Sequence, residues 1–296
     1  MHKIEYSIVR ILYGIFSSIS FRAGRSIAYI LYLITAHIIH YRKKTILKNL
    51  KLVYGDNLPM PQKALLNNIY KNFIYLWMEF LQTSKLSADN INEHFNIQNF
   101  ELIDEALSGN KGMIILSGHF GNFEWLGQLV GLKGYKLSGI AKRQSNPYVN
   151  ALIEKNRTRF GVGVIYTKNS VKVSLEKLAK NEIIAIVTDQ DARDRGIFVD
   201  FMGIPSSTAV GPAVLYLRSG APILFVISIR KAYGKFDVFF EKVCDGPAMQ
   251  TTDELIRGIT QRHTLILEKW VKKYPEQWFW MHRRWKTRPY EETDIL

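Results

Sequence analysis

The sequence predicts an α/β fold in which a largely parallel, mixed sheet is flanked by helices. Short apolar runs typical of buried strands alternate with helical segments of about ten residues. The run IIAIVT at residues 183–188 is continuously apolar, as in strands that are covered on both faces. An apolar, proline-free stretch at residues 4–40 precedes this pattern and predicts an N-terminal helical membrane-associating segment. We therefore expect two parts, residues 1–45 and residues 46–296.

Hydrophobic periodicity and turn residues place the elements in order. Residues 61–82 carry apolar side chains at helical spacing, which predicts a long helix with one wide apolar face. The further helices are expected at residues 99–108, 123–131, 147–160, 171–180, 210–219 and 252–274. The strands are expected at residues 113–116, 136–141, 162–166, 183–188, 223–230 and 236–241. A loop is expected to lead from the strand at 183–188 to Ser207.

Two interpretations of the N-terminal stretch stay open. Its cleanest apolar run, residues 26–40, is shorter than the roughly 20 residues that a membrane-spanning helix needs. It can be a membrane anchor, either a tilted span or an interfacial helix, held by the basic run at residues 42–44 on the cytoplasmic side. Alternatively, it is a pair of helices that pack on the rest of the protein. The basic run favours the membrane.

The charge of the chain indicates an anionic partner. Forty Lys and Arg residues against 26 Asp and Glu residues give a net charge of +14 and a pI near 9.7. Nucleic acid, an anionic bilayer and a phosphorylated or acidic substrate all suit this surplus. The basic residues stand beside apolar and aromatic stretches at both ends, and no nucleic-acid-binding motif is recognisable, so we expect a membrane surface and no nucleic acid. Cys244 is the single cysteine and implies no internal disulfide.

The strongest chemical signal is the segment SGHFGNFE at residues 117–124. It follows an expected strand and precedes an expected helix, and in open α/β sheets ligands bind beyond the carboxyl ends of the strands. Gly118 and Gly121 permit a tight turn that brings His119 near Glu124 in the first helical turn. A histidine oriented by a carboxylate can act as a general base near neutral pH. From spacing alone, a purely structural hydrogen bond at the helix start stays open.

Two later blocks carry further polar candidates. The segment at residues 187–195 follows a buried strand and contains Asp189 and Asp191, which lie either in a solvated loop or on the same rim as His119. The segment at residues 201–212 places the hydroxyl of Thr208 ahead of an expected helix. It suits either helix capping or the binding of an anion by backbone amides.

These blocks, in this order, resemble the lysophospholipid acyltransferase superfamily and specifically its bacterial lipid A biosynthesis (lauroyl/myristoyl) acyltransferase branch. The resemblance extends from the apolar N-terminus to the block QWFWMHRRW at residues 277–285. The family's His-x4-acid motif matches His119 and Glu124, which the resemblance implies are catalytic. Substrate-binding positions are implied for the residues that match the family's other blocks, namely Arg143, Asp189, Asp191 and Thr208. The chain lacks the Glu-Gly-Thr-Arg-type block of glycerol-phosphate acyltransferases, which favours a glycolipid acceptor.

The resemblance implies an enzyme of lipid A and lipopolysaccharide biosynthesis at the cytoplasmic side of the inner membrane. Such an enzyme transfers a fatty acyl group from an acyl carrier protein, or less often from coenzyme A, to a lipid hydroxyl. His119 would be the general base, oriented by Glu124, and neither a metal, another cofactor nor a covalent acyl-enzyme is needed. The expected partners are an acyl carrier protein, anionic inner-membrane lipids and a glycolipid acceptor. Alternatives are another phospholipid or glycolipid acceptor, a lipid esterase, which lacks support because no Gly-x-Ser-x-Gly motif is present, and a non-catalytic membrane-surface protein.

Overall fold

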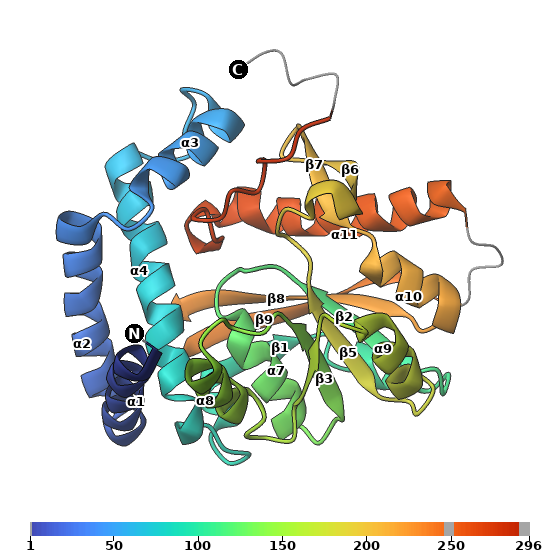
Figure 1. Ribbon diagram of the computed structural model, residues 1–296, viewed down its shortest axis with the longest axis horizontal. Coiled ribbons are helices and arrows are strands. Elements are labelled where there is room, and N and C mark those ends of the chain that lie inside the picture. Colours follow the sequence, from blue (N-terminus) through green and yellow to red (C-terminus); the bar gives the residue numbers. More distant parts are fainter. Residues whose placement is uncertain (1, 246–251, 290–296) are drawn as a thin grey trace.

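The computed structural model describes residues 2–245 and 252–289 and contains a seven-stranded mixed sheet flanked by helices (Figure 1). The strands are β1 (Phe95–Gln98), β2 (Met113–Ser117), β3 (Leu137–Ala141), β4 (Gly163–Tyr166), β5 (Ile183–Val187), β6 (Gly196–Phe201), β7 (Ile204–Ala209), β8 (Ile223–Ala232) and β9 (Lys235–Cys244). The α-helices are α1 (His2–Ser18), α2 (Phe21–Ile34), α3 (Lys43–Tyr54), α4 (Gln62–Leu81), α5 (Ile91–His94), α6 (Leu102–Leu107), α7 (Phe123–Leu132), α8 (Pro147–Arg157), α9 (Ser170–Leu178), α10 (Gly211–Ser219) and α11 (Asp253–Lys273). Short 3₁₀ segments lie at Thr83–Lys85, Arg193–Arg195 and Pro275–Gln277, and a π-helical turn at Thr35–Ile39.

The sheet has the order β1-β9-β8-β2-β5-β3-β4 and confirms the predicted α/β class. All neighbouring pairs are parallel except β8 and β9, which form an antiparallel hairpin. Strands β6 and β7 form a separate antiparallel hairpin. Strand β2 lies between β8 and β5, so the segments that follow β2 and β5 leave the same edge of the sheet side by side.

Alternate side chains of the central strands enter two different apolar cores. On β2, Ile114 and Leu116 pack in the core that includes residues of α9, α10 and α11. Met113 and Ile115 point to the opposite face and pack in a second core with Trp125 of α7. Both faces of β2 are therefore buried, which explains why it reads as a continuous apolar run rather than an alternating one.

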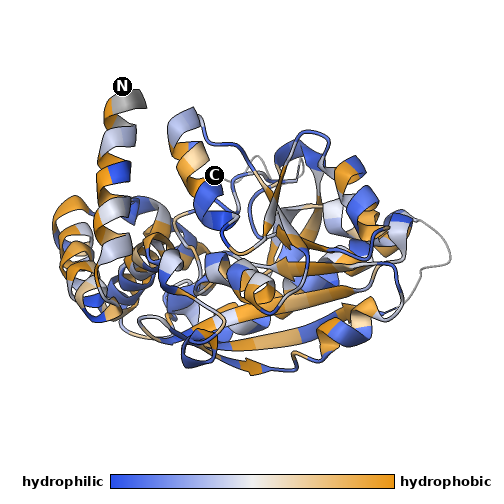
Figure 2. Ribbon diagram, turned by 90° about the horizontal axis from the view of Figure 1, so that it is seen from below, coloured by the Kyte–Doolittle hydropathy of each residue, from blue (hydrophilic) through white to orange (hydrophobic). Residues whose placement is uncertain are grey.

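Helices α1 and α2 lie beside α4 at one side of the molecule (Figure 1). Phe16 of α1 and Ala28 of α2 pack with Tyr75 and Met78 of α4 in a third, smaller apolar cluster. The opposite side of α1 leaves large apolar residues exposed, and Figure 2 shows its first turns projecting from the body. In the described parts of the chain, every helix is too short or too polar to traverse a bilayer.

Several elements were not predicted from the sequence, among them α3, α5, β1 and the hairpin β6–β7. Strand β1 has only four residues and forms the edge of the sheet, where one neighbour suffices. The predicted loop before Ser207 is instead the hairpin β6–β7, whose two-residue turn places Met202 and Gly203 at φ of +61° and +74°. Such turns usually contain Asn-Gly or Asp-Gly, so a methionine gives no hairpin signal. Here the backbone amide of Met202 is held by the carboxylate of Glu268, at 2.6 Å.

Candidate active site

His119 and Asp189 meet at the carboxyl ends of two neighbouring parallel strands. His119 follows β2, and Asp189 follows β5, which pairs with β2 from Met113 to Ser117. The Nδ1 atom of His119 lies 2.6 Å from Oδ1 of Asp189. The backbone amide of His119 donates a second hydrogen bond, of 2.8 Å, to Oδ2 of the same carboxylate. Asp189 therefore fixes both the position and the ring orientation of the histidine.

The electrostatic environment keeps Asp189 ionised. Its side chain is only 2% exposed, and this burial by itself favours the neutral acid. The charge of His119, the two hydrogen bonds from His119 and one from the indole Nε1 of Trp278 outweigh the burial and lower the pKa of Asp189 to about 2. A carboxylate on Nδ1 selects the tautomer that leaves the lone pair on Nε2. The histidine is thus arranged to accept a proton at Nε2.

The turn that carries His119 is held by residues near the C-terminus. Phe120 forms an isolated antiparallel bridge with Trp278, and the backbone amide of Phe279 donates to the carbonyl of His119. Gly121 has φ of +55°, and a Cβ atom there would lie 1.7 Å from the carbonyl oxygen of Ser228. Gly121 is therefore required both for the conformation of the turn and for its close approach to β8.

Glu124 does not form the expected pair with His119, and this prediction is corrected. Both carboxylate oxygens of Glu124 accept hydrogen bonds from Arg157, at 2.5 and 3.0 Å, in a bidentate ion pair. The side chain of Glu124 is 7% exposed and that of Arg157 26%. Although burial opposes the charge of Arg157, the adjacent Glu124 raises its pKa. Because Glu124 lies in the first turn of α7 and Arg157 ends α8, the ion pair joins these two helices.

The other residues predicted to bind substrate lie in three different environments. The Asp191 carboxylate accepts a hydrogen bond from the hydroxyl of Thr287, and its backbone amide donates to Nε2 of His282. Burial lowers the pKa of His282, in agreement with a neutral ring that accepts this bond. The guanidinium of Arg143 stacks over the ring of Tyr166, at 4.5 Å from its centroid.

Thr208 is buried and bonds to other residues of the protein. It lies within β7 rather than at a helix start, and α10 begins without a side-chain cap. Its buried hydroxyl donates to the carbonyl of Ser206 and accepts a hydrogen bond from Arg284. Its hydroxyl proton and one of its lone pairs are therefore used inside the protein.

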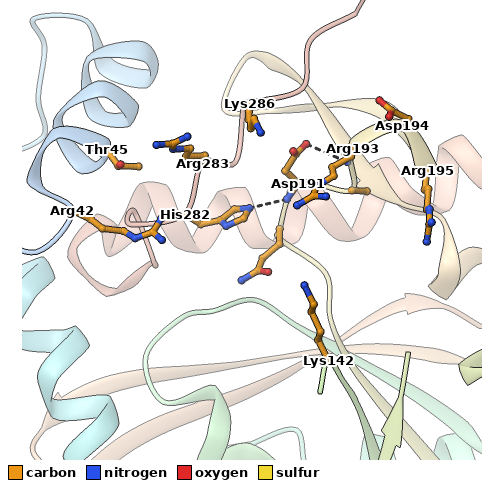
Figure 3. A pocket seen from close by; sticks show the side chains of 12 residues that line it. Arg42, Thr45, Lys142, Asp191, Arg193, Asp194, Arg195, His282, Arg283 and Lys286 are labelled. Atoms are coloured by element: carbon orange, nitrogen blue, oxygen red, sulfur yellow. Dashed lines mark hydrogen bonds between the residues drawn. The ribbon is translucent and has the colours of Figure 1, made fainter. Parts of the chain in front are cut away.

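A large cavity opens between the loop after β5 and the C-terminal segment (Figure 3). Its volume is about 1020 Å³, and its walls come from the start of α3, the end of β3, the loop after β5 and the C-terminal segment. Gln190 lines this cavity, and its carboxamide Nε2 lies 3.3 Å from Nε2 of His119. Gln190 therefore connects Nε2 of His119 with the cavity.

Sequence reasoning missed three residues that support the site. Trp278 holds Asp189, Gln190 contacts His119, and Arg284 donates to the carbonyls of Gln190 and Ser207 from a buried position. Burial lowers the pKa of Arg284 to about 10. The available signal was a tryptophan and an arginine in one short C-terminal segment. Their partners are distant in sequence, because Trp278 lies 89 residues after Asp189 and Arg284 lies 94 residues after Gln190.

A carboxylate-bound histidine at the carboxyl edge of a parallel sheet, next to a large cavity, is an arrangement typical of enzymes that abstract a proton from a bound substrate. The particular family follows from the sequence match. The chain belongs to the bacterial lipid A biosynthesis acyltransferase family, whose model matches residues 6–287. It is therefore an acyltransferase.

Curated relatives agree with this assignment. The chain is 27% identical over 258 residues to the lipid A biosynthesis palmitoleoyltransferase of Escherichia coli (strain K12). This match covers 84% of the chain and 80% of the relative. It is 23% identical over 254 residues to the lipid A biosynthesis lauroyltransferase of the same organism, with the same two shares. A phosphatidylinositol mannoside acyltransferase of Mycobacterium tuberculosis (strain CDC 1551 / Oshkosh) is 23% identical over 188 residues, 62% of this chain and 57% of the relative. These names indicate lipid A or glycolipid acyltransferases.

Proposed function

We propose that this acyltransferase moves a fatty acyl group from an acyl carrier protein thioester to a hydroxyl of a lipid A precursor or a related glycolipid, with His119 as the general base. The observation that carries the proposal is the hydrogen bond between Nδ1 of His119 and buried Asp189, which leaves the lone pair of the ring on Nε2. Asp189 takes the orienting role that was expected of Glu124. Glu124 acts instead through its ion pair with Arg157.

The chemistry is a direct transfer without an acyl-enzyme. His119 Nε2 accepts the proton of the acceptor hydroxyl while the oxygen attacks the thioester carbonyl carbon. The resulting tetrahedral oxyanion collapses, the carbon–sulfur bond breaks, and the imidazolium returns its proton to the departing thiolate. The Asp189 carboxylate stabilises the imidazolium during the interval in which it carries the extra proton. Gln190, which contacts Nε2 in the absence of substrate, must give way to the acceptor hydroxyl.

Charge supports the choice of partners. An acyl carrier protein is acidic, a lipid A precursor carries phosphates, and the inner membrane surface is anionic, so a chain with net charge +14 is attracted to all three. The mycobacterial relative acts, by its name, on a phosphatidylinositol mannoside, and this favours a glycolipid other than lipid A as the second candidate acceptor.

We also propose that the enzyme works at the cytoplasmic side of the inner membrane, anchored through its N-terminal helices without crossing the bilayer. Exposed isoleucines at positions 4, 8, 11 and 15 recur along α1 at three- and four-residue spacing, which gives one apolar stripe. Exposed Ile30, Ile38 and Ile39 continue the apolar surface on α2 and the π-helical turn. An amphipathic helix of this kind inserts in the interface between headgroups and acyl chains.

Replacement of His119 by alanine tests the proposed general base. Loss of the base should lower kcat by on the order of 10²–10⁴ while the fold persists, because the side chain of His119 is partly exposed, at 22%. The measurement is transfer of a radiolabelled acyl group from acyl carrier protein to a purified lipid A precursor. Circular dichroism and thermal unfolding verify the fold. Full activity in the alanine variant removes His119 as the base.

The acceptor is identified separately by mass spectrometry of lipids from a strain that lacks the gene. A lipid A species that is short of one acyl chain, restored by the wild-type gene, supports a lipid A precursor. A change confined to another glycolipid supports the second candidate. Release of free fatty acid without any acceptor indicates an esterase instead.

A further inference from the structure

The cavity beside His119 is strongly basic. We call it the basic cavity and define it by its twelve lining residues, of which six are Lys or Arg and two are Asp (Figure 3). The six cations are Arg42, Lys142, Arg193, Arg195, Arg283 and Lys286. They come from four separate segments of the chain, so the fold, rather than a local run of charge, gathers them around one space.

Most of these cations are not engaged by other side chains. Among the described residues, five of the six, all except Arg42, make no side-chain hydrogen bond and no ion pair. Arg42 donates to the carbonyl of Met281 and still lines the cavity. Asp191 and Asp194 line the same cavity and offset only two of the six positive charges. The cations that remain in excess repel each other, so an anionic ligand would stabilise them.

Backbone strain supports a ligand-binding role for two of the arginines. Arg42 and Arg193 have φ of +53° and +56°, in the left-handed region that arginine rarely adopts. Four of the eight described non-glycine residues in this region are asparagines, which tolerate it. The conformation of Arg193 is held by a 2.6 Å hydrogen bond from the hydroxyl of Ser207 to its carbonyl. Strain maintained by surrounding contacts is typical of ligand sites.

We propose that the basic cavity binds a ligand with at least two phosphate groups, and that this ligand is the headgroup of the acceptor lipid. The inference rests on the proposed acyl transfer for the identity of the ligand as acceptor, but not for the binding of phosphates. Because Gln190 both lines the cavity and touches Nε2 of His119, a headgroup held there presents its hydroxyls next to the base.

The number of charges distinguishes the acceptor from the acyl donor. The phosphopantetheine arm of an acyl carrier protein has a single phosphodiester, which carries one negative charge. Six cations against two carboxylates exceed what one charge balances, whereas two phosphomonoesters carry between three and four charges near neutral pH. The volume of about 1020 Å³ is at the upper end of small-ligand sites, of roughly 300–1,000 Å³, and suits a sugar-phosphate headgroup.

A binding experiment on the whole enzyme tests the phosphate site without any acyl transfer. Sodium tripolyphosphate serves as the probe in isothermal titration calorimetry, with sodium sulfate at equal ionic strength as the reference anion. The test variant is Arg195→Gln/Lys286→Gln, which removes two charges from different segments. The side chains of Arg195 and Lys286 make no hydrogen bond or ion pair among the described residues, so the variant should fold like the wild type.

The matched control removes two exposed lysines elsewhere, in Lys172→Gln/Lys180→Gln on and just after α9. We expect tripolyphosphate to bind wild type and control equally and more tightly than sulfate, and to bind the test variant on the order of tenfold more weakly. Equal binding by test and control variants would show that net charge alone attracts the probe and would overturn the cavity as a phosphate site.

Steady-state kinetics then assign the ligand. In the test variant the KM for the phosphorylated acceptor should rise on the order of tenfold, with the KM for acyl carrier protein thioester within twofold of wild type. A rise in the donor KM alone would assign the cavity to the phosphopantetheine arm and overturn the acceptor assignment. If the enzyme transfers no acyl group to any phosphorylated lipid, the proposed function fails, while the calorimetry still decides whether the cavity binds phosphates.

Discussion

Asp189 is the residue on which the geometry of the site depends, because its two oxygens receive the ring, the backbone amide of His119 and the indole of Trp278. Glu124 is nearer to His119 in sequence, and sequence distance made it the expected partner. Spatial proximity in a parallel sheet instead follows strand order, and β2 pairs with β5. A prediction of strand order would have identified Asp189 as the partner, since it is the first acidic residue after β5.

The lowered pKa of Asp189 predicts a pH-dependent contribution to stability. The folded pKa, about 2, is below the ordinary value of 3.8, so the ionised carboxylate stabilises the fold fully above pH 3.8 and loses that effect as the pH falls toward 2. We expect Asp189→Asn to lower the free energy of unfolding by about 2 kcal/mol at pH 6. The difference from wild type should shrink below pH 4. Urea unfolding at several pH values measures it, and a difference that grows on acidification would contradict the assignment.

At the scale of secondary structure, the ion pair between Glu124 and Arg157 joins the start of α7 to the end of α8. Helix α7 begins directly after the His119 turn, so its position affects the site. Asn122 caps this helix and also donates to the buried Glu79 of α4, whose pKa is raised by burial. Glu124 is thus one of several contacts that fix where α7 begins.

A double-mutant cycle tests whether Glu124 acts through Arg157. If it does, Glu124→Gln, Arg157→Gln and the double variant should lower kcat by similar factors, on the order of tenfold, because each breaks the same pair. If Glu124 acts on His119 directly, Arg157→Gln should be much the milder change. The control breaks another partly buried ion pair, in Lys177→Gln/Glu182→Gln, and should leave kcat unchanged.

Long, periodic elements were predictable from the sequence, whereas contacts between distant segments were not. The helix predicted at residues 61–82 is α4 (Gln62–Leu81), and the strand at 183–188 is β5 (Ile183–Val187). Their apolar patterns are strong because each places apolar side chains in the core. The clamp of residues 277–279 on the His119 turn depends on backbone hydrogen bonds, which leave no side-chain pattern to read.

At the scale of the whole molecule, the apolar stripe of α1 and the net charge of +14 predict reversible binding to anionic bilayers. Replacement of Ile8, Ile11 and Ile15 by glutamine should reduce binding to phosphatidylglycerol-containing vesicles at least about tenfold, since each buried isoleucine contributes roughly 1.5–3 kcal/mol. Vesicle sedimentation measures the bound fraction. Activity on an acceptor dispersed in detergent should persist.

The control for the membrane prediction is Leu255→Gln/Leu265→Gln, which replaces exposed apolar residues of α11. This variant should bind vesicles like the wild type. If both variants lose binding equally, general surface hydrophobicity rather than the α1 stripe accounts for it.

The cations of the basic cavity can be replaced more easily than the His119–Asp189 pair. His119 and Asp189 are tied to two strands and to the C-terminal segment, so their replacement disturbs several contacts at once. Five of the six cations make no side-chain hydrogen bond or ion pair in the described structure, and mutations there carry little folding penalty. A lineage of such enzymes can therefore drift from one phosphorylated acceptor to another by successive surface substitutions, while the proton-transfer apparatus is inherited unchanged.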